Sequence, residues 1–227
     1  MSTMRTPLLR LSISRLDMSL IFCVLNPSSV NRFFNSDDFK FLLNIVVIVF
    51  FFVILLIVSN LYLFKTKIKH KAYLTFGGKK IQCFVGGGGI GKKVREGDMI
   101  TPRGVFKLLE VFYRSGRVSS FHTNLPKRRL KRTSMWCVDS QSPFYNSYIE
   151  GFKKFKCEKL FRDDSLYDIF INLNYNIYPT KKFRGSAIFM HCCDSKTKFT
   201  EGCVAFKKKH IIEVLKFIRP TSKLIIY

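Results

Sequence analysis

RGSAIFMHCCDSKTKFTEGC, residues 184–203, decides more about the fold and chemistry of this chain than any other stretch. Its apolar run, 187–190, is typical of a strand and ends on a histidine, His191. A Thr-Glu-Gly-Cys tetrad follows at residues 200–203. An imidazole at a strand end and a thiol on a glycine turn suit a thiol nucleophile, because the base takes the thiol proton and backbone N–H groups can bind an oxyanion. The stretch therefore predicts a cysteine enzyme that transfers acyl groups.

In this hypothesis Cys203 is the nucleophile and His191 is the general base and acid. The N–H groups of Gly202 and Cys203 form the oxyanion hole, and we expect a pH–rate profile with its acid limb near neutrality. Each residue alone has a plainer interpretation, since free cysteines and lone histidines are often structural. Cys192 and Cys193 are rival thiols, but neither has a glycine turn, so we expect them to be packing residues.

Four further residues are predicted to bind substrate. Arg184 or Arg114 suits a substrate carboxylate as a bidentate partner, although a surface role is equally compatible with the sequence. Glu201 suits an incoming ammonium group or His191, and Thr200 lies in the same tetrad. We expect no metal and no organic cofactor, because the cysteines lack the paired spacing of zinc ligands.

The charge of the chain is strongly positive and lies almost entirely after residue 64. Of the net +24, residues 65–227 carry 34 Lys and Arg against 12 Asp and Glu, which is +22. Such a surface attracts polyanions, namely nucleic acid, anionic lipid or an acidic cell-wall polymer, or it serves solubility alone. Charge by itself does not choose the partner.

The chain divides by composition into four segments. Residues 41–64 hold no charged side chain and, at about 1.5 Å per helical residue, can cross a hydrocarbon layer of about 30 Å. We therefore expect a poorly ordered tail at 1–40, a transmembrane anchor at 41–64, a basic linker at 65–72 and one catalytic domain at 73–227.

The sequence gives conflicting indications of the side of the membrane on which the catalytic domain lies. Lysines after the anchor favour a cytoplasmic C-terminal side, and seven cysteines without CxxC spacing fit a reducing compartment. Chemistry on the cell wall requires the opposite side. We expect a single-pass protein of the inner (cytoplasmic) membrane with its catalytic domain on the periplasmic, cell-wall side, or a cytoplasmic protein if the anchor is not translated.

The domain itself is predicted to be mainly β with a few helices. Six segments have strand patterning: 72–76, 80–85, 104–113, 165–173, 186–191 and 223–227. One helix is expected over 207–218, where apolar residues fall on one face and Pro220 follows. The stretch GGGGIGKK, 86–93, nearly matches a phosphate-binding loop, but Lys93 replaces the Ser or Thr and no helix follows, so we expect a loop without nucleotide.

The ordered motifs of the chain resemble the L,D-transpeptidase (YkuD-like) catalytic domain family from about Cys83 onward. The motifs are Lys-x-x-Arg-Glu-Gly-Asp ending at Asp98, Thr101-Pro102-x-Gly104, Tyr113-Arg114-x-x-Arg117, Trp136-Cys137, Tyr145-Asn146, Leu166-Tyr167-Asp168, Arg184 to His191, and Thr200 to Ala205. The resemblance implies a β-sandwich-like fold with a capping helix and a cysteine that is acylated by peptidoglycan stem peptides. Glu201 stands where the family more often has a second histidine, and Ala205 where it has asparagine.

We therefore expect cysteine-dependent acyl transfer on peptidoglycan stem peptides, in cell wall cross-linking or remodelling, with no nucleic acid partner. One alternative is a hydrolase of the same fold, an L,D-carboxypeptidase or endopeptidase, because the replaced histidine and asparagine leave the acyl acceptor open. The other is a non-catalytic, basic, membrane-tethered binding module in which Cys203 is an inert core thiol.

Overall fold

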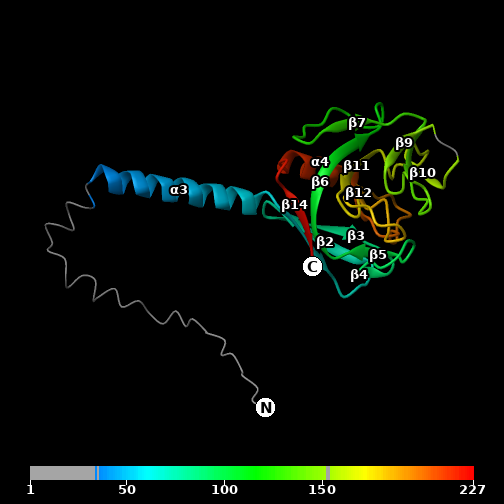
Figure 1. Ribbon diagram of the computed structural model, residues 1–227, viewed down its shortest axis with the longest axis horizontal. Helices are drawn as coiled ribbons and strands as arrows, with labels where there is room; N and C mark the ends of the chain where they lie inside the picture. Colours follow the sequence, from blue (N-terminus) through cyan, green and yellow to red (C-terminus); the bar gives the residue numbers. More distant parts are fainter. Residues whose placement is uncertain (1–33, 35, 152–153) are drawn as a thin grey trace, which may run out of the picture. The chain divides into compact units, whose positions relative to one another are not determined.

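The computed structural model describes residue 34 and residues 36–151 and 154–227 (Figure 1). Most of the tail predicted at 1–40 lies outside these residues. The chain divides into two units, residues 1–52 and 53–227, which are described separately.

Helix α3, Asp37–Val58, is shorter than the predicted anchor and begins earlier. Two aspartates in its first turn and a hydrogen bond from Phe39 N to Ser36 Oγ, 3.2 Å, fit the electrostatics of a helix start. Among the described residues, no helix has the length and apolar character needed to cross a membrane.

The predicted anchor at 41–64 is wrong at its C-terminal end, because Leu61–Lys65 is strand β1 of the main sheet. Leu61 and Leu63 are completely buried there, so burial on alternate positions of a strand outweighs the continuous apolar run. The predicted linker at 65–72 likewise holds the end of β1 and the start of β2, Lys71–Phe76. The sheet therefore starts before residue 73.

The main sheet has nine strands in the order β11-β12-β13-β3-β2-β1-β14-β6-β7. Its strands not yet bounded are β3 Lys79–Phe84, β6 Gly104–Tyr113, β7 Lys127–Arg129, β11 Ile169–Leu173, β12 Phe189–Cys192, β13 Val204–Phe206 and β14 Lys223–Ile226. The prediction of a mainly β domain is confirmed, and β6 has the predicted bounds.

Strand β6 closes this sheet on itself. Its first half pairs with β14, from Gly104 opposite Ile226 to Lys107 opposite Lys223. Its second half pairs with β11, the first strand of the order, so the sheet closes at β6, and β7 is attached beside it. A closed sheet of this kind surrounds one core and leaves few free strand edges.

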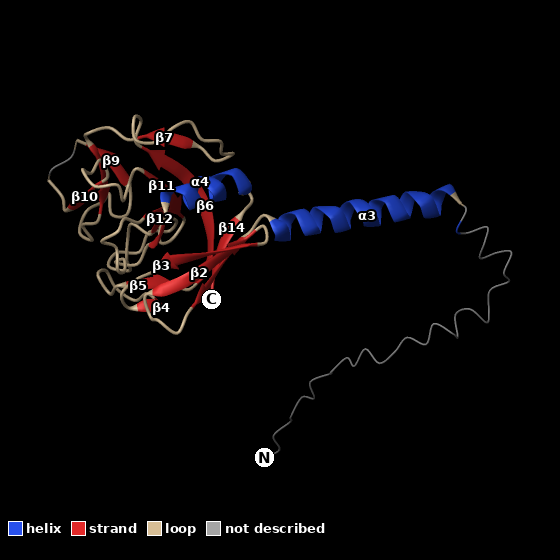
Figure 2. Ribbon diagram, turned by 180° about the vertical axis from the view of Figure 1, so that it is seen from behind, coloured by secondary structure: helices blue, strands red, loops and turns tan. Residues whose placement is uncertain are grey.

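Two apolar clusters lie on the two sides of the β11–β12 region. The main cluster is enclosed by the sheet and includes Ile211, Val214 and Leu215 of helix α4, Lys208–Phe217, which contacts β11 and β12 (Figure 2). This helix confirms the one predicted over 207–218. The second cluster lies beneath a small sheet of three strands, β8 Ser134–Cys137, β9 Tyr148–Glu150 and β10 Cys157–Lys159.

The glycine-rich stretch 86–93 forms no phosphate-binding loop. Strand β4, Gly89–Gly91, pairs in parallel with β5, Ile100–Pro102, and no helix follows it. A Cβ on Gly86 would lie 2.0 Å from Met99 O, so close backbone approach explains the glycine there.

Candidate active site

The alternation of β12 brings the two predicted catalytic residues to one side of the sheet. Ile188, Met190 and Cys192 point into the main cluster, where Cys192 is fully buried, as expected of a packing residue. Phe189 points to the other side and shares the second cluster with Cys203. His191 follows Phe189 at the next position of the same parity, so imidazole and thiol lie on one face.

The Cys203 side chain is 8% exposed and is held by two backbone groups. Phe189 N donates to Sγ at 3.3 Å, and the thiol donates to Ala187 O at 3.1 Å. Burial raises the pKa of the thiol to about 12, and Glu158 adds to the rise, whereas the Phe189 N–H and Lys93 oppose it. In this conformation Cys203 is a protonated thiol directed at a carbonyl.

Ala187 adopts a left-handed conformation, φ +54°, that a non-glycine residue rarely takes. Asn146 Oδ1 accepts the Ala187 N–H at 2.9 Å and the Trp136 indole N–H at 3.0 Å. The Asn146 amide nitrogen donates to the carbonyls of Tyr175 and Asn176. Such backbone strain costs about 1–3 kcal/mol. The buried asparagine therefore helps to hold Ala187 in the conformation in which its carbonyl accepts the thiol hydrogen bond.

The turn before Cys203 is tied together by Thr200. Its hydroxyl donates to Cys203 O at 2.7 Å and accepts the Gly202 N–H at 3.2 Å. The predicted oxyanion donor, Gly202 N–H, therefore has a partner within the turn, and Thr200 holds the turn rather than facing substrate as a free group.

His191 is buried, and its imidazole is not hydrogen-bonded to the thiol. Nδ1 lies 2.8 Å from Cys192 O, and the Tyr167 ring packs edge-on at a centroid distance of 5.3 Å. Burial lowers the pKa of His191 to about 4, so the imidazole is neutral at physiological pH. A neutral imidazole is the form that can accept a proton, although the thiol must first rotate away from Ala187 O.

Both residues line one cavity of about 770 Å³. Four carboxylates also line it: Glu96, Glu158, Asp194 and Glu201. So do two buried or half-buried cations, Lys93 and Arg162. Desolvation raises the pKa of Glu158, which accepts the Tyr167 hydroxyl hydrogen bond. The cavity is therefore charged with both signs, as a site for a zwitterionic ligand would be.

The two arginines predicted to bind substrate do not line this cavity. Arg184 is exposed and donates from Nη1 to Val94 O at 3.2 Å. The Arg114 guanidinium lies 3.8 Å over the Phe161 ring and donates to Arg162 O. Both hold neighbouring loops.

Glu201 is exposed at the cavity and makes no ion pair or hydrogen bond with the residues that the structure describes. It is the one predicted substrate-binding residue that is both in the cavity and unengaged.

Sequence reasoning missed several residues of the cavity wall. Lys93 and Glu96 belong to the Lys-x-x-Arg-Glu-Gly-Asp motif, and Tyr167 to the Leu-Tyr-Asp motif, so a signal was present. Arg162 and Glu158 lie in stretches with no recognisable pattern. In the described part of the chain, no group of three or more His, Cys, Asp and Glu side chains is arranged to hold a metal.

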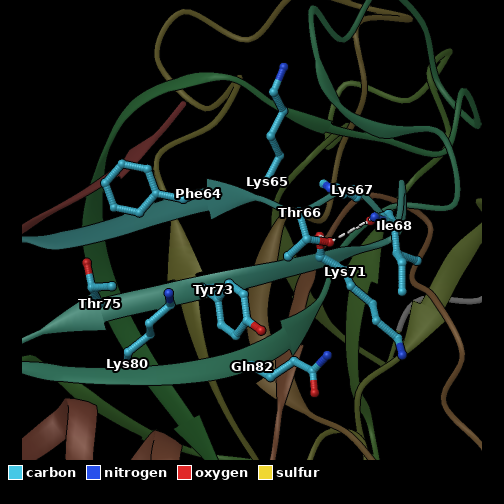
Figure 3. A pocket seen from close by; sticks show the side chains of 10 residues that line it. All are labelled: Phe64, Lys65, Thr66, Lys67, Ile68, Lys71, Tyr73, Thr75, Lys80 and Gln82. Atoms are coloured by element: carbon cyan, nitrogen blue, oxygen red, sulfur yellow. Dashed lines mark hydrogen bonds between the residues drawn. The ribbon is translucent and has the colours of Figure 1, made fainter.

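A second hollow lies on the outer face of β1, β2 and β3, away from these residues (Figure 3). Its lining includes four lysines and no carboxylate: Lys65, Lys67, Lys71 and Lys80. Phe64, Tyr73 and Gln82 are cross-strand neighbours on its floor, and Lys80 Nζ lies 4.3 Å from the Tyr73 ring centroid. We call this set of residues the lysine groove.

Comparison with known proteins assigns most of the chain to one family. Residues 60–226 match YkuD, the L,D-transpeptidase catalytic domain. No curated protein matches the chain.

Two solved structures are similar in part. The structure of Bdellovibrio bacteriovorus Bd1075 has 14% identity and a TM-score of 0.35 over 74% of this chain and 48% of that one. The Ldtfm–avibactam carbamoyl enzyme has 9% identity and a TM-score of 0.33 over 75% and 49%. The chain spans about half the length of these structures.

Proposed function

The chain belongs to the YkuD family of L,D-transpeptidase catalytic domains, and on this premise we propose that it is a cysteine acyltransferase of peptidoglycan stem peptides. The family acts on peptidoglycan through a cysteine. The proposal assigns the nucleophile to Cys203 and the general base to His191.

The proposed reaction has two steps. The thiol proton passes to the His191 imidazole while Sγ bonds to the carbonyl carbon of a stem-peptide bond. When the carbon–nitrogen bond breaks, the leaving amine takes the proton from His191 and a thioester remains on Cys203. An incoming amine then attacks the thioester and gives a proton to His191. The carbon–sulfur bond breaks, and the departing sulfur takes that proton from His191, which restores the thiol and the neutral imidazole.

One observation carries the proposal: Cys203 and His191 line the same cavity, on the same face of the sheet. The resting thiol donates to Ala187 O, and hydrogen bonds at catalytic sites are often formed only when substrate is bound.

Intact-mass spectrometry after incubation with a tetrapeptide donor tests this assignment. We expect an acyl adduct on the wild-type chain and on Cys193→Ala, and none on Cys203→Ala. Cys193 is a matched control, because it is a half-buried thiol two residues from His191. An adduct that persists on Cys203→Ala would remove the nucleophile from the proposal.

Transfer to an amine is favoured over hydrolysis by Glu201. Its exposed carboxylate at the cavity has no partner among the described residues, which suits an acceptor ammonium. Product analysis with and without an acceptor amine separates the two: a cross-linked product supports transfer, and free acid alone supports an L,D-carboxypeptidase or endopeptidase.

The proposed substrate belongs to the cell wall, so we also propose that the catalytic domain works on the outer side of the cytoplasmic membrane. Labelling whole cells with a membrane-impermeant thiol reagent tests this location. Modification of Cys193 before lysis supports it, and modification only after lysis supports a cytoplasmic domain.

A second candidate function, favoured by the lysine groove, is binding of an anionic cell-wall polymer. Four lysines without a neighbouring carboxylate attract phosphodiester groups, and the aromatic floor adds apolar contact (Figure 3). We expect inorganic polyphosphate to bind the wild type and to bind Lys65→Gln/Lys71→Gln/Lys80→Gln more weakly and with less salt dependence. Binding that survives these changes would contradict the groove as the site.

A further inference from the structure

Lys93 is a buried cation that the proposed mechanism has not used. Its ammonium lies 2.6 Å from Asp98 Oδ1, and the two side chains are 2% and 6% exposed. Burying such a pair is unfavourable unless the charges make further contacts, so its position at the catalytic cavity calls for a role.

Two glycines make room for this side chain. A Cβ on Gly185 would lie 2.3 Å from Lys93 Cε, and a Cβ on Gly202 would lie 3.5 Å from Lys93 Nζ. Both glycines have positive φ, +97° and +140°. The stem therefore passes Gly185 and delivers the ammonium beside Gly202, the residue that precedes the nucleophile.

The ammonium has unused hydrogen-bonding capacity. Among the described residues, Asp98 is its one hydrogen-bond partner, although an ammonium has three N–H donors. Asp98 in turn accepts backbone N–H groups from Val94, Arg95 and Ile100, so its carboxylate keeps partners without the lysine.

We propose that Lys93 is a further catalytic residue, which donates a charged hydrogen bond to the oxyanion that forms when Cys203 attacks a carbonyl. This inference rests on the proposed acyl transfer. The Gly202 N–H is already bonded to Thr200 Oγ1, and the ammonium lies beside that same residue.

In the proposed step, Sγ bonds to the carbonyl carbon and the electron pair of the C=O bond moves to oxygen. Lys93 stays protonated throughout, and the thiol proton goes to His191. When the oxyanion collapses, the bond to the leaving group breaks. The contribution of Lys93 is charge stabilisation of an intermediate, which a fixed cation whose side chain is only 2% exposed performs well.

Two small probes separate this role from an effect on the thiol alone. p-Nitrophenyl acetate acylates a thiol through an oxyanion, whereas iodoacetamide alkylates it by displacement without one. Rates are measured at Cys203 by mass spectrometry across pH, with Cys203→Ala as the blank. The variants are Lys93→Met and Lys92→Met, the latter an exposed neighbouring lysine as the matched control.

We expect Lys93→Met to lower the limiting acylation rate by about 10²–10³-fold, the usual loss for one oxyanion donor, with the limiting alkylation rate unchanged. Lys92→Met should match the wild type in both. A shift of the curves along the pH axis with unchanged limits would overturn the proposal, and so would an equal fall in both rates. If Lys93→Met does not fold, Lys93→Gln, which keeps a donor for Asp98 without the charge, is tested against the same expectations.

The outcome is independent of the proposed substrate. If the wild type reacts with p-nitrophenyl acetate but not with a tetrapeptide donor, the stem-peptide function fails while the Lys93 comparison stands on its own result.

Discussion

The two faces of strand β12 differ in chemistry, although the residues that form them are adjacent in the sequence. Ile188, Met190 and Cys192 point into a mainly aliphatic apolar core that includes side chains of helix α4. Phe189 and His191 point toward aromatic rings, the Cys203 thiol and a charged cavity. On the first face the Cys192 thiol, a weak donor, meets Ile169 O, whereas on the second face both the imidazole and the nucleophilic thiol need backbone partners.

This difference shows how a small domain separates stability from chemistry. The enclosed core provides free energy of folding through burial, and it holds β12 rigidly enough to fix the position of His191. The other face includes a left-handed alanine and a thiol with a raised pKa, which only a rigid support can maintain. Of two substitutions at adjacent residues of this strand, one should therefore lower the reaction rate and the other should lower the stability of the fold.

The largest effect on rate is expected for His191→Ala. Loss of a general base lowers acylation by about 10²–10⁴-fold. His122→Ala, which removes an exposed histidine, is the control and should react like the wild type. Stopped-flow acylation at Cys203 measures both, and an unchanged rate with a lower melting temperature would make His191 a structural residue.

The substitution at the neighbouring residue, Met190→Ala, should lower stability and leave the acylation rate unchanged. Met190 is completely buried in the main core, so its truncation should lower the free energy of unfolding by about 2–5 kcal/mol. The acylation rate per folded molecule should equal that of the wild type. Denaturant titration and active-site counting measure the two effects, and a loss of rate in fully folded protein would break the separation of the faces.

The acylation rate should fall at a lower pH than it would with a histidine of ordinary pKa. Burial lowers the pKa of His191 to about 4, so the acid limb of acylation should lie near pH 4 and not near neutrality as the sequence suggested. Because the unfolded imidazole binds protons more tightly, stability should be full above about pH 6.5 and fall as the pH is lowered toward 4. His191→Ala should flatten the stability curve in that window, and an acid limb near 6.5 would contradict burial of the base.

The smallest effect is expected for Glu201→Gln. An exposed carboxylate that meets an ammonium contributes about 0.2–1 kcal/mol, so transfer to an amine should slow by no more than about fivefold. Acylation should not change. Single-turnover kinetics separate the steps, and faster acylation with unchanged transfer would instead mean that Glu201 acts on the thiol.

The sequence allowed the parts with local patterning to be predicted. Strand β6 has the predicted bounds, and α4 lies within one residue of its prediction, because alternation and helical spacing are properties of neighbouring residues. Strand β1 was missed, since its two buried leucines continue an apolar run whose end only the sheet defines. The pairing of β6 with β11 has no local signal at all.

Prediction of the site was likewise limited to features formed by neighbouring residues. His191 and Cys203 were found because a strand end and a glycine turn are local features. Lys93 was set aside with the glycine-rich loop, because Gly185 and Gly202, which make room for it, lie far along the chain. Arg184 lies beside the predicted catalytic strand, yet adjacency in sequence did not determine that its side chain would bind Val94 O outside the cavity.

The parallel pairing of β1 with β14 has a consequence for biosynthesis. Strand β1, the first strand along the chain, has β14 as one neighbour, from Leu61 opposite Leu224 to Leu63 opposite Ile226. A nascent chain therefore lacks that partner until β14 has left the ribosome, and contacts between such distant segments form slowly. The ring of strands can close only once β14 has left the ribosome, so translocation machinery that acts on the chain before that point would meet a domain whose topology is incomplete.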